Sequence, residues 1–316
     1  MSGVRSKVGR GVRRTFGWRP YPAEDSPSCA LCGAHDRVTV ARRVSDDMRY
    51  PTVVCRACGL VYMFPRPSAA SFRHFYEAVF VDLFDGSTAN VDIRAEVMSS
   101  ERGRPLLEFL SESRPVEAMR AVLDIGCGDG GLLLGFADVI GERGLAGKIA
   151  LAGCDPARPP GEAVERIRAG SAISIWRRGV EEVAVDVSEY DVLVMFDVLE
   201  HLLEPRRVLQ HLHDGARDDT LLFVATSCLD HFNEIPAAGF EDYYLRIGHP
   251  YTFTSSSLRR LLASAGWRVE REAPAAKGDQ WVVARRDTPD PSATDPVAGA
   301  CAQALEFIRS YKARCA

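Results

Sequence analysis

The sequence has no apolar run long enough to cross a bilayer and no secretory signal of the usual kind. It also lacks a strong charge imbalance, because 39 basic and 43 acidic residues give a net charge of −4. This near balance argues neither for nor against nucleic acid as a partner. Nine cysteines, an odd number, without a secretion signal indicate a reducing compartment. We therefore expect a cytoplasmic protein without a membrane span, while the oligomeric state is not predicted.

Basic residues are concentrated at the amino terminus, where residues 1–20 hold five arginines and one lysine but no acid. Such a composition favours a solvated arm. A segment that contacts phosphates or an acidic surface is the alternative.

From residue 121 onward, short apolar runs alternate with helical or loop segments. This alternation is typical of a buried parallel sheet with crossover helices. The predicted strands are 121–126, 149–155, 172–177, 191–197, 220–227, 267–272 and 280–286. Only seven residues separate the last two runs, whereas a crossover needs about a dozen. The final strand is therefore expected to run antiparallel to its neighbour.

A glycine-rich loop, in the run VLDIGCGDGG, follows the first predicted strand. Gly126, Gly128 and Gly131 also match the dinucleotide-binding spacing. Three features argue against a dinucleotide. Asp124 ends the strand where it would meet a cation rather than a pyrophosphate. The loop carries Asp129 and no basic residue, and the sheet ends in a hairpin, unlike a doubly wound dinucleotide sheet.

The run VLDIGCGDG resembles the first motif of class I S-adenosylmethionine-dependent methyltransferases, and FDVLEHLLEP, at 196–205, resembles the end of the fourth strand in many small-molecule members. The resemblance implies an α/β fold with a seven-stranded Rossmann-like methyltransferase sheet, a reversed last strand, and S-adenosylmethionine as cofactor. A carboxylate-rich loop suits this ligand because it carries a sulfonium and an ammonium. The cofactor-binding residues that the resemblance implies are Asp124, Gly126, Cys127, Gly128, Asp155, Pro156, Val180, Glu181, Asp197 and Val198.

Two cysteine pairs, Cys29/Cys32 and Cys55/Cys58, have the spacing of metal-binding knuckles. Four thiolates complete a tetrahedral zinc site with no open position. The zinc is therefore expected to be structural and to support a segment too small to fold on its own core. Two redox pairs are the alternative.

The run CRACGLVYMFPRPS, followed by FRHFYE, resembles the amino-terminal zinc module of bacterial sugar C-methyltransferases and related natural-product methyltransferases. In that group the module caps the substrate pocket. The group also carries a Tyr-x-Glu-His type cluster after the fifth strand, and here Gly248 stands where the acid is expected. The acceptor atom is therefore left open.

These features predict a basic tail at 1–20, a small zinc ribbon at 21–67 and a helical linker or lid at 68–115. The methyltransferase domain is expected at 116–285, and a linker with a terminal helix at 286–316.

Three residues are candidate catalytic groups: His201 and His249 for acid–base work at the acceptor, and Tyr251 to orient the acceptor. His201 could instead orient its own loop, while His249 and Tyr251 could pack a lid. The leading hypothesis is methyl transfer to a small molecule, a sugar or natural-product intermediate in bacterial biosynthesis. An RNA methyltransferase is one alternative, which a zinc segment of mixed charge and the missing Asn-Pro-Pro-Tyr type motif disfavour. A non-catalytic cofactor-binding adaptor is the other.

Overall fold

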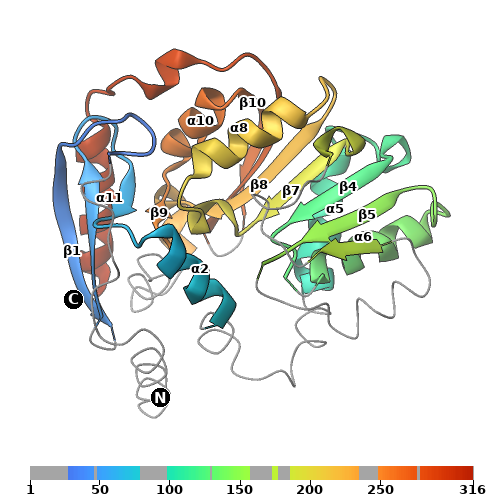
Figure 1. Ribbon diagram of the computed structural model, residues 1–316, viewed down its shortest axis with the longest axis horizontal. Helices are drawn as coiled ribbons and strands as arrows, with labels where there is room; N and C mark the ends of the chain where they lie inside the picture. The colour runs from blue at the N-terminus through green and yellow to red at the C-terminus, as the bar shows by residue number, and fades with distance from the viewer. Residues whose placement is uncertain are drawn as a thin grey trace, which may run out of the picture.

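The computed structural model describes residues 28–45, 48–78, 98–128, 130–156, 173–176, 186–234, 248–275 and 278–315. These residues form one large and one small sheet with helices packed on them (Figure 1). The large sheet has the strand order β10-β11-β8-β7-β4-β5-β6. Its strands are β4 (Ala121–Ile125), β5 (Ala150–Cys154), β6 (Ile173–Trp176), β7 (Val192–Phe196), β8 (Leu221–Ser227), β10 (Trp267–Pro274) and β11 (Asp279–Arg286).

The direction of each strand follows from the length of the connection before it. Strands β4, β5, β6, β7 and β8 pair in parallel, as expected for runs separated by crossovers. Strand β11 is antiparallel to both β10 and β8. The predicted seven-strand sheet with a reversed last strand is confirmed.

Helices cover both faces of the large sheet. On one face, α5 (Arg104–Ser111) and α6 (Gly131–Glu142) bury their apolar side chains against β4, β7 and β8. On the other face lie α8 (Pro205–Gly215) and α10 (Ser255–Ser264). The short helical turns are η2 (Ser99–Gly103), η3 (Val116–Ala118), η4 (Val187–Glu189), η5 (Leu199–His201), η6 (Leu229–Glu234) and η9 (Pro291–Thr294).

The start of α10 is specified locally. Thr254 Oγ1 accepts a hydrogen bond from Ser257 N at 3.1 Å, and Ser257 Oγ accepts one from Thr254 N at 2.9 Å. This reciprocal capping box satisfies two backbone donors that would otherwise lack partners. Thr254 is therefore the N-cap of α10. None of the helices in the described part of the chain is long and apolar enough to span a bilayer.

The small sheet joins two distant parts of the chain. It contains β1 (Arg37–Ser45), β2 (Met48–Cys55) and β3 (Val61–Met63), followed in space by β9 (Tyr251–Thr252). Strand β9 belongs to the segment between β8 and α10 of the large sheet. The N-terminal module, defined here as residues 28–78 and ending with α2 (Ala69–Ala78), is therefore continuous with the rest of the fold.

The terminal helix α11 (Ala300–Cys315) lies beside β1 and β2, at the end of the molecule away from β5 (Figure 1). Its residues Ala304, Ile308 and Tyr311 form an apolar cluster with Val54 of β2 and Val61 of β3. The chain before the helix also contacts the second cysteine turn, because Val297 N donates to Ala57 O at 2.8 Å. The helix thus covers the outer face of the small sheet.

Two glycines in equivalent cysteine turns provide a matched test of this contact. The N–H of Gly33 donates to Cys29 O at 2.8 Å, and that of Gly59 donates to Cys55 O at 3.0 Å. Their φ angles are 72° and 76°, so alanine is strained equally at both. A Cβ on Gly59 would lie 2.6 Å from Ala300 O, whereas a Cβ on Gly33 would have no neighbour within 4 Å.

We expect Gly59→Ala to lower the free energy of unfolding by about 1–3 kcal/mol more than Gly33→Ala does, because only the first substitution pushes α11 away. Urea unfolding of the two variants measures this difference. Equal losses would show that the contact with α11 contributes no stability.

Candidate functional site

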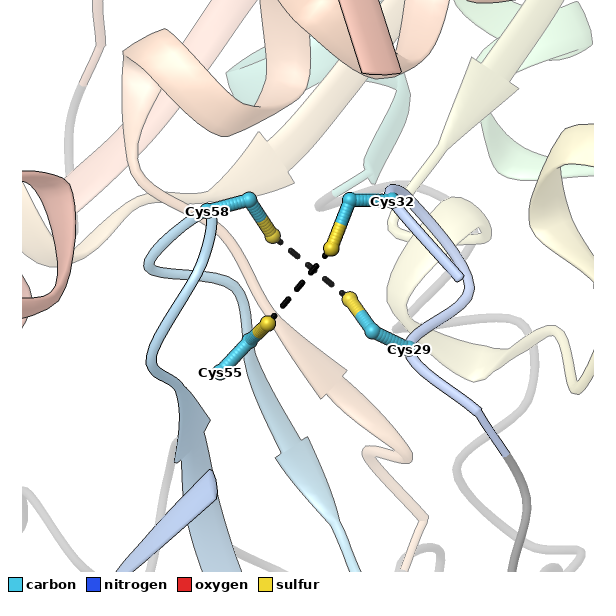
Figure 2. Close-up of side chains that lie close together, drawn as sticks. All are labelled: Cys29, Cys32, Cys55 and Cys58. Atoms are coloured by element: carbon cyan, nitrogen blue, oxygen red, sulfur yellow. Dashed lines mark hydrogen bonds between the residues drawn. The ribbon is translucent and has the colours of Figure 1, made fainter. Parts of the chain in front are cut away.

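Four thiols converge between the two cysteine turns (Figure 2). Cys29 Sγ lies 3.5 Å from Cys58 Sγ, and Cys32 Sγ lies 3.5 Å from Cys55 Sγ. A tetrahedral zinc ion with Zn–S bonds of about 2.3 Å holds its sulfurs roughly 3.8 Å apart. Three of these cysteines are buried and Cys32 is half-buried. The donor set therefore fits a closed, structural zinc site.

The glycine loop and the end of β5 meet at the carboxyl edge of the large sheet. Asp155, directly after β5, accepts a hydrogen bond from the N–H of Gly128 at 3.0 Å. The N–H groups of Gly126 and Cys127 both donate to Cys154 O, at 2.7 and 3.1 Å. Because β4 and β5 are parallel neighbours, residues from two separate motifs lie side by side here.

Asp124, at the end of β4, is a buried acid beneath this loop. It is 1% exposed, and neither carboxyl oxygen has a hydrogen-bond partner among the described residues. Burial, with a smaller contribution from the charge of Asp155, raises the pKa of Asp124 well above its usual range. An unpaired buried carboxyl group is costly, so this position suits a ligand that brings positive charge or hydrogen-bond donors.

The loop after β7 packs against the glycine loop. Gly126 has a φ of 76°, and a Cβ on it would lie 2.4 Å from Val198 Cγ2. Asp197, the first residue after β7, is itself in the left-handed region with a φ of 53°. The Cys127 thiol is buried, and burial raises its pKa, which favours the neutral thiol. The ends of β4, β5 and β7 thus bring most of the predicted cofactor residues together.

Two histidines meet beside this edge. The ring centroids of His201 and His249 lie 4.6 Å apart with an interplanar angle of 79°. His201 ends η5, and the buried His249 comes two residues before β9. Tyr76 of α2 reaches the same place, because its hydroxyl oxygen lies 2.6 Å from His201 Nδ1 and donates to Gly248 O at 3.2 Å.

These contacts assign the proton on His201. Its Nδ1 lies 2.7 Å from the carbonyl oxygen of Gly248, and a carbonyl oxygen only accepts hydrogen bonds. With the Tyr76 hydroxyl donating to the same carbonyl, the contact between Nδ1 and Gly248 O favours the tautomer that carries its proton on Nδ1. Nε2 is then the basic nitrogen of the neutral ring.

No curated protein matches the chain. The methyltransferase domain family matches residues 95–272, more than half of the sequence. The chain belongs to this methyltransferase family. With its seven-stranded sheet and reversed last strand, it is a class I methyltransferase, the class that uses S-adenosylmethionine.

Two solved structures illustrate the similarity. Magnesium protoporphyrin IX methyltransferase from Synechocystis PCC 6803, solved with bound SAH, is 16% identical, with a TM-score of 0.49 over 70% of this chain and 100% of that chain. The 1,6-didemethyltoxoflavin-N1-methyltransferase from Burkholderia thailandensis is 20% identical, with a TM-score of 0.49 over 72% of this chain and 96% of that chain. At these identities neither structure assigns an acceptor to this methyltransferase.

The hydroxyl of Tyr251, a predicted catalytic group, is engaged by the protein. It donates to Leu203 O at 2.9 Å and accepts a hydrogen bond from Arg66 Nη1. Tyr251 is 1% exposed, and burial raises its pKa above the ordinary value. This arrangement favours a structural role for the hydroxyl over direct contact with an acceptor.

Three predicted cofactor-binding residues remain. Pro156 is exposed directly after Asp155. Val180 and Glu181, the predicted adenine contacts, lie outside the described residues.

Two residues of this region were not found from sequence. Tyr76 lies in the segment that the sequence predicts only as a helical linker or lid, and nothing local distinguishes it from its neighbours. Glu200 precedes His201 in the fourth-strand motif, which was the only signal available. One donor atom from each of Glu200, His201 and His249 lies within 4.8 Å of the others.

Glu200 should make the stability of the methyltransferase depend on pH. Burial raises its pKa from 4.5 to about 8, and the nearby Asp197 adds to this shift. Between these values the folded state holds a proton that the unfolded chain has lost, so stability falls as pH rises. Glu200→Gln removes the ionisable group and with it this loss of stability at higher pH. The variant should gain about 1–3 kcal/mol in unfolding free energy relative to the wild type between about pH 6 and pH 8.

Urea unfolding at several pH values measures this gain. Glu117→Gln serves as the control because Glu117 is exposed and hydrogen bonds, including one from Arg143, lower its pKa. Its effect should not vary over the same range. A pH-independent difference for Glu200→Gln would mean that Glu200 is already charged in the folded protein.

Proposed function

We propose that this methyltransferase transfers the methyl group of S-adenosylmethionine to a small-molecule acceptor, a sugar or natural-product intermediate of bacterial biosynthesis. The observation that carries the proposal is the juxtaposition of a buried, unpaired carboxyl group at Asp124 with the half-buried His201 and the buried His249 on the same edge of the sheet. The first suits a cationic cofactor, and the second suits proton removal from an acceptor.

The residues that would hold the cofactor come from the ends of three strands. Asp155 has one carboxylate oxygen engaged by Gly128 N, and an acid at this strand end can accept hydrogen bonds from ribose hydroxyls. Asp124 offers an unpaired carboxyl group beneath the loop, and a cationic ligand would favour its ionised form. Val198 and Gly126 form the contact that closes the loop against β7. This donor set fits a ligand that carries a sulfonium, an ammonium and a ribose.

When bound, S-adenosylmethionine supplies a methyl group on a positively charged sulfur as the electrophile. The chain must then hold the acceptor in line and exclude water. His201 Nε2 is the basic nitrogen that takes the acceptor proton, and its orientation is held by Gly248 O and Tyr76. His249 packs edge-on against His201 and would orient the acceptor or share the proton.

A small acceptor is supported by the cover over this edge. Gly248 and His249 are buried, Glu200 is 2% exposed, and Tyr76 of the N-terminal module closes over His201. An RNA acceptor would need an open, basic approach to the same histidines. The enclosed geometry favours a molecule that the N-terminal module can surround.

Two substitutions should separate the cofactor side from the acceptor side. Asp155→Ala removes the proposed ribose contact and should weaken S-adenosylmethionine binding at least about tenfold, because a charge-assisted hydrogen bond contributes roughly 1.5–3 kcal/mol. His249→Ala removes the imidazole that would orient the acceptor or share its proton and leaves the cofactor loops intact, so it should lower turnover at least about a hundredfold with cofactor affinity nearly unchanged.

Calorimetry gives the affinities, and transfer of a radiolabelled methyl group to a panel of sugars, phenols and amines gives turnover. The same assay with a total RNA pool tests the alternative acceptor class. Unchanged affinity in Asp155→Ala would refute the cofactor assignment. Methylation of RNA alone would refute the small-molecule proposal, and binding without any turnover would favour an adaptor.

We also propose that the four cysteines hold one structural zinc ion per chain. Cys55→Ser should reduce the bound zinc and lower Tm by at least roughly 5 °C, because a structural metal contributes folding free energy directly. Cys301→Ser is the matched control, since Cys301 is a half-buried cysteine outside the cluster. Elemental analysis of purified wild-type protein that found no zinc would refute the assignment.

A further inference from the structure

One buried arginine of the N-terminal module reaches the catalytic half of the protein. Arg66 follows β3 and is 7% exposed. Its Nη1 donates to Leu203 O at 3.0 Å and to the hydroxyl of Tyr251. Nη1 also lies 3.3 Å from the carboxylate of Glu204, which is half-exposed. A buried guanidinium with these partners is held in a fixed place, since its planar donors are strongly directional.

The two segments that Arg66 contacts are those that carry the histidines. Leu203 comes two residues after His201, and Tyr251 comes two residues after His249. The Tyr251 hydroxyl also donates to Leu203 O at 2.9 Å. The Arg66 guanidinium and the Tyr251 hydroxyl therefore link the two segments. In each segment the linked residue lies two positions after the histidine.

The backbone of the N-terminal module supports the same junction. Strand β3 pairs with β9 through Tyr62 and Tyr251. Met63 N donates to the carbonyl of Pro250 at 2.8 Å. Arg66 is thus attached to a strand that is itself bonded to the segment of His249. Any change in the place of Arg66 would alter the distance between the two histidine-bearing segments.

We propose that Arg66 is a positioning residue that sets the geometry of the His201–His249 pair. This inference rests on the proposed function, in which that pair receives the acceptor proton. Arg66 touches neither histidine in the contacts described above and acts through Leu203 and Tyr251. The N-terminal module therefore contributes to the reaction by orienting the base as well as by covering it.

The test is nitrogen NMR of histidine-labelled full-length protein, which reports the tautomer of each imidazole without an acceptor. In the wild type, His201 should show a single tautomer protonated at Nδ1. In Arg66→Met, the ring nitrogen resonances of His201 and His249 should shift toward those of a tautomer mixture. Arg66→Lys should restore the wild-type resonances only in part, because an ammonium lacks the planar donor set.

A second arginine with a largely buried side chain provides the control for a purely structural effect. The side chains of Arg66 and Arg114 are 8% and 12% exposed, and Arg114 Nη1 bonds the buried Asp191 at 2.7 Å. Arg114→Met should lower Tm without moving the histidine resonances, since Asp191 precedes β7 at the opposite end of the strand. S-adenosylmethionine affinity and zinc content should match the wild type in both methionine variants.

Unchanged histidine resonances in a folded Arg66→Met variant would overturn the proposal. If Arg66→Met does not fold, Tyr251→Phe removes one hydroxyl of the same junction and should produce the same shift, and unchanged resonances there would also overturn it. Absence of methyl transfer in the wild type would refute the proposed function alone, because the resonances report on Arg66 without turnover.

Discussion

The arrangement of the site depends on the pairing of β3 with β9. These strands exchange only two residue pairs, Val61 with Thr252 and Tyr62 with Tyr251, yet they join the cysteine-containing sheet to the chain that follows β8. On the outer side of that sheet, α11 buries the apolar residues that the pairing leaves exposed. A two-residue strand has little stability of its own, so β9 depends on its neighbour. The cysteine-containing segment and the histidine region are therefore one structural unit.

Two buried aspartates at opposite edges of the large sheet differ in their hydrogen-bond partners. Asp191, at the amino edge, is fully satisfied by Arg114 and by the N–H groups of Arg120 and Ala121. Asp124, at the carboxyl edge, has no such partner among the described residues. The first stabilises the fold through charge-assisted bonds. The second is held in an unfavourable state that a cationic ligand would relieve, which is how perturbed acids indicate functional sites.

The family relationship covers only part of this chemistry. The match to the methyltransferase domain begins at residue 95, so it excludes the cysteine cluster, Arg66 and Tyr76. The strand ends that would receive the cofactor lie within the matched region. The groups that approach His201 from the other side come from the N-terminal module. Methyl transfer is thus a property of the family, while Tyr76 and Arg66, which contact the segment of His201, belong to the N-terminal module.

The sequence alone determined the features that depend on neighbouring residues. The seven-residue gap before β11 required a reversed strand, the paired cysteines predicted two metal-binding turns, Thr254 began α10, and the glycine loop followed β4. The tertiary structure decided which distant residues meet. His201 and His249, Arg66 and Leu203, and β3 and β9 are each separated by dozens of residues or more, and no local pattern marks such contacts. These contacts form because β9 pairs with β3 as the last strand of the small sheet. That pairing depends on packing and on backbone hydrogen bonds, which no sequence motif predicts.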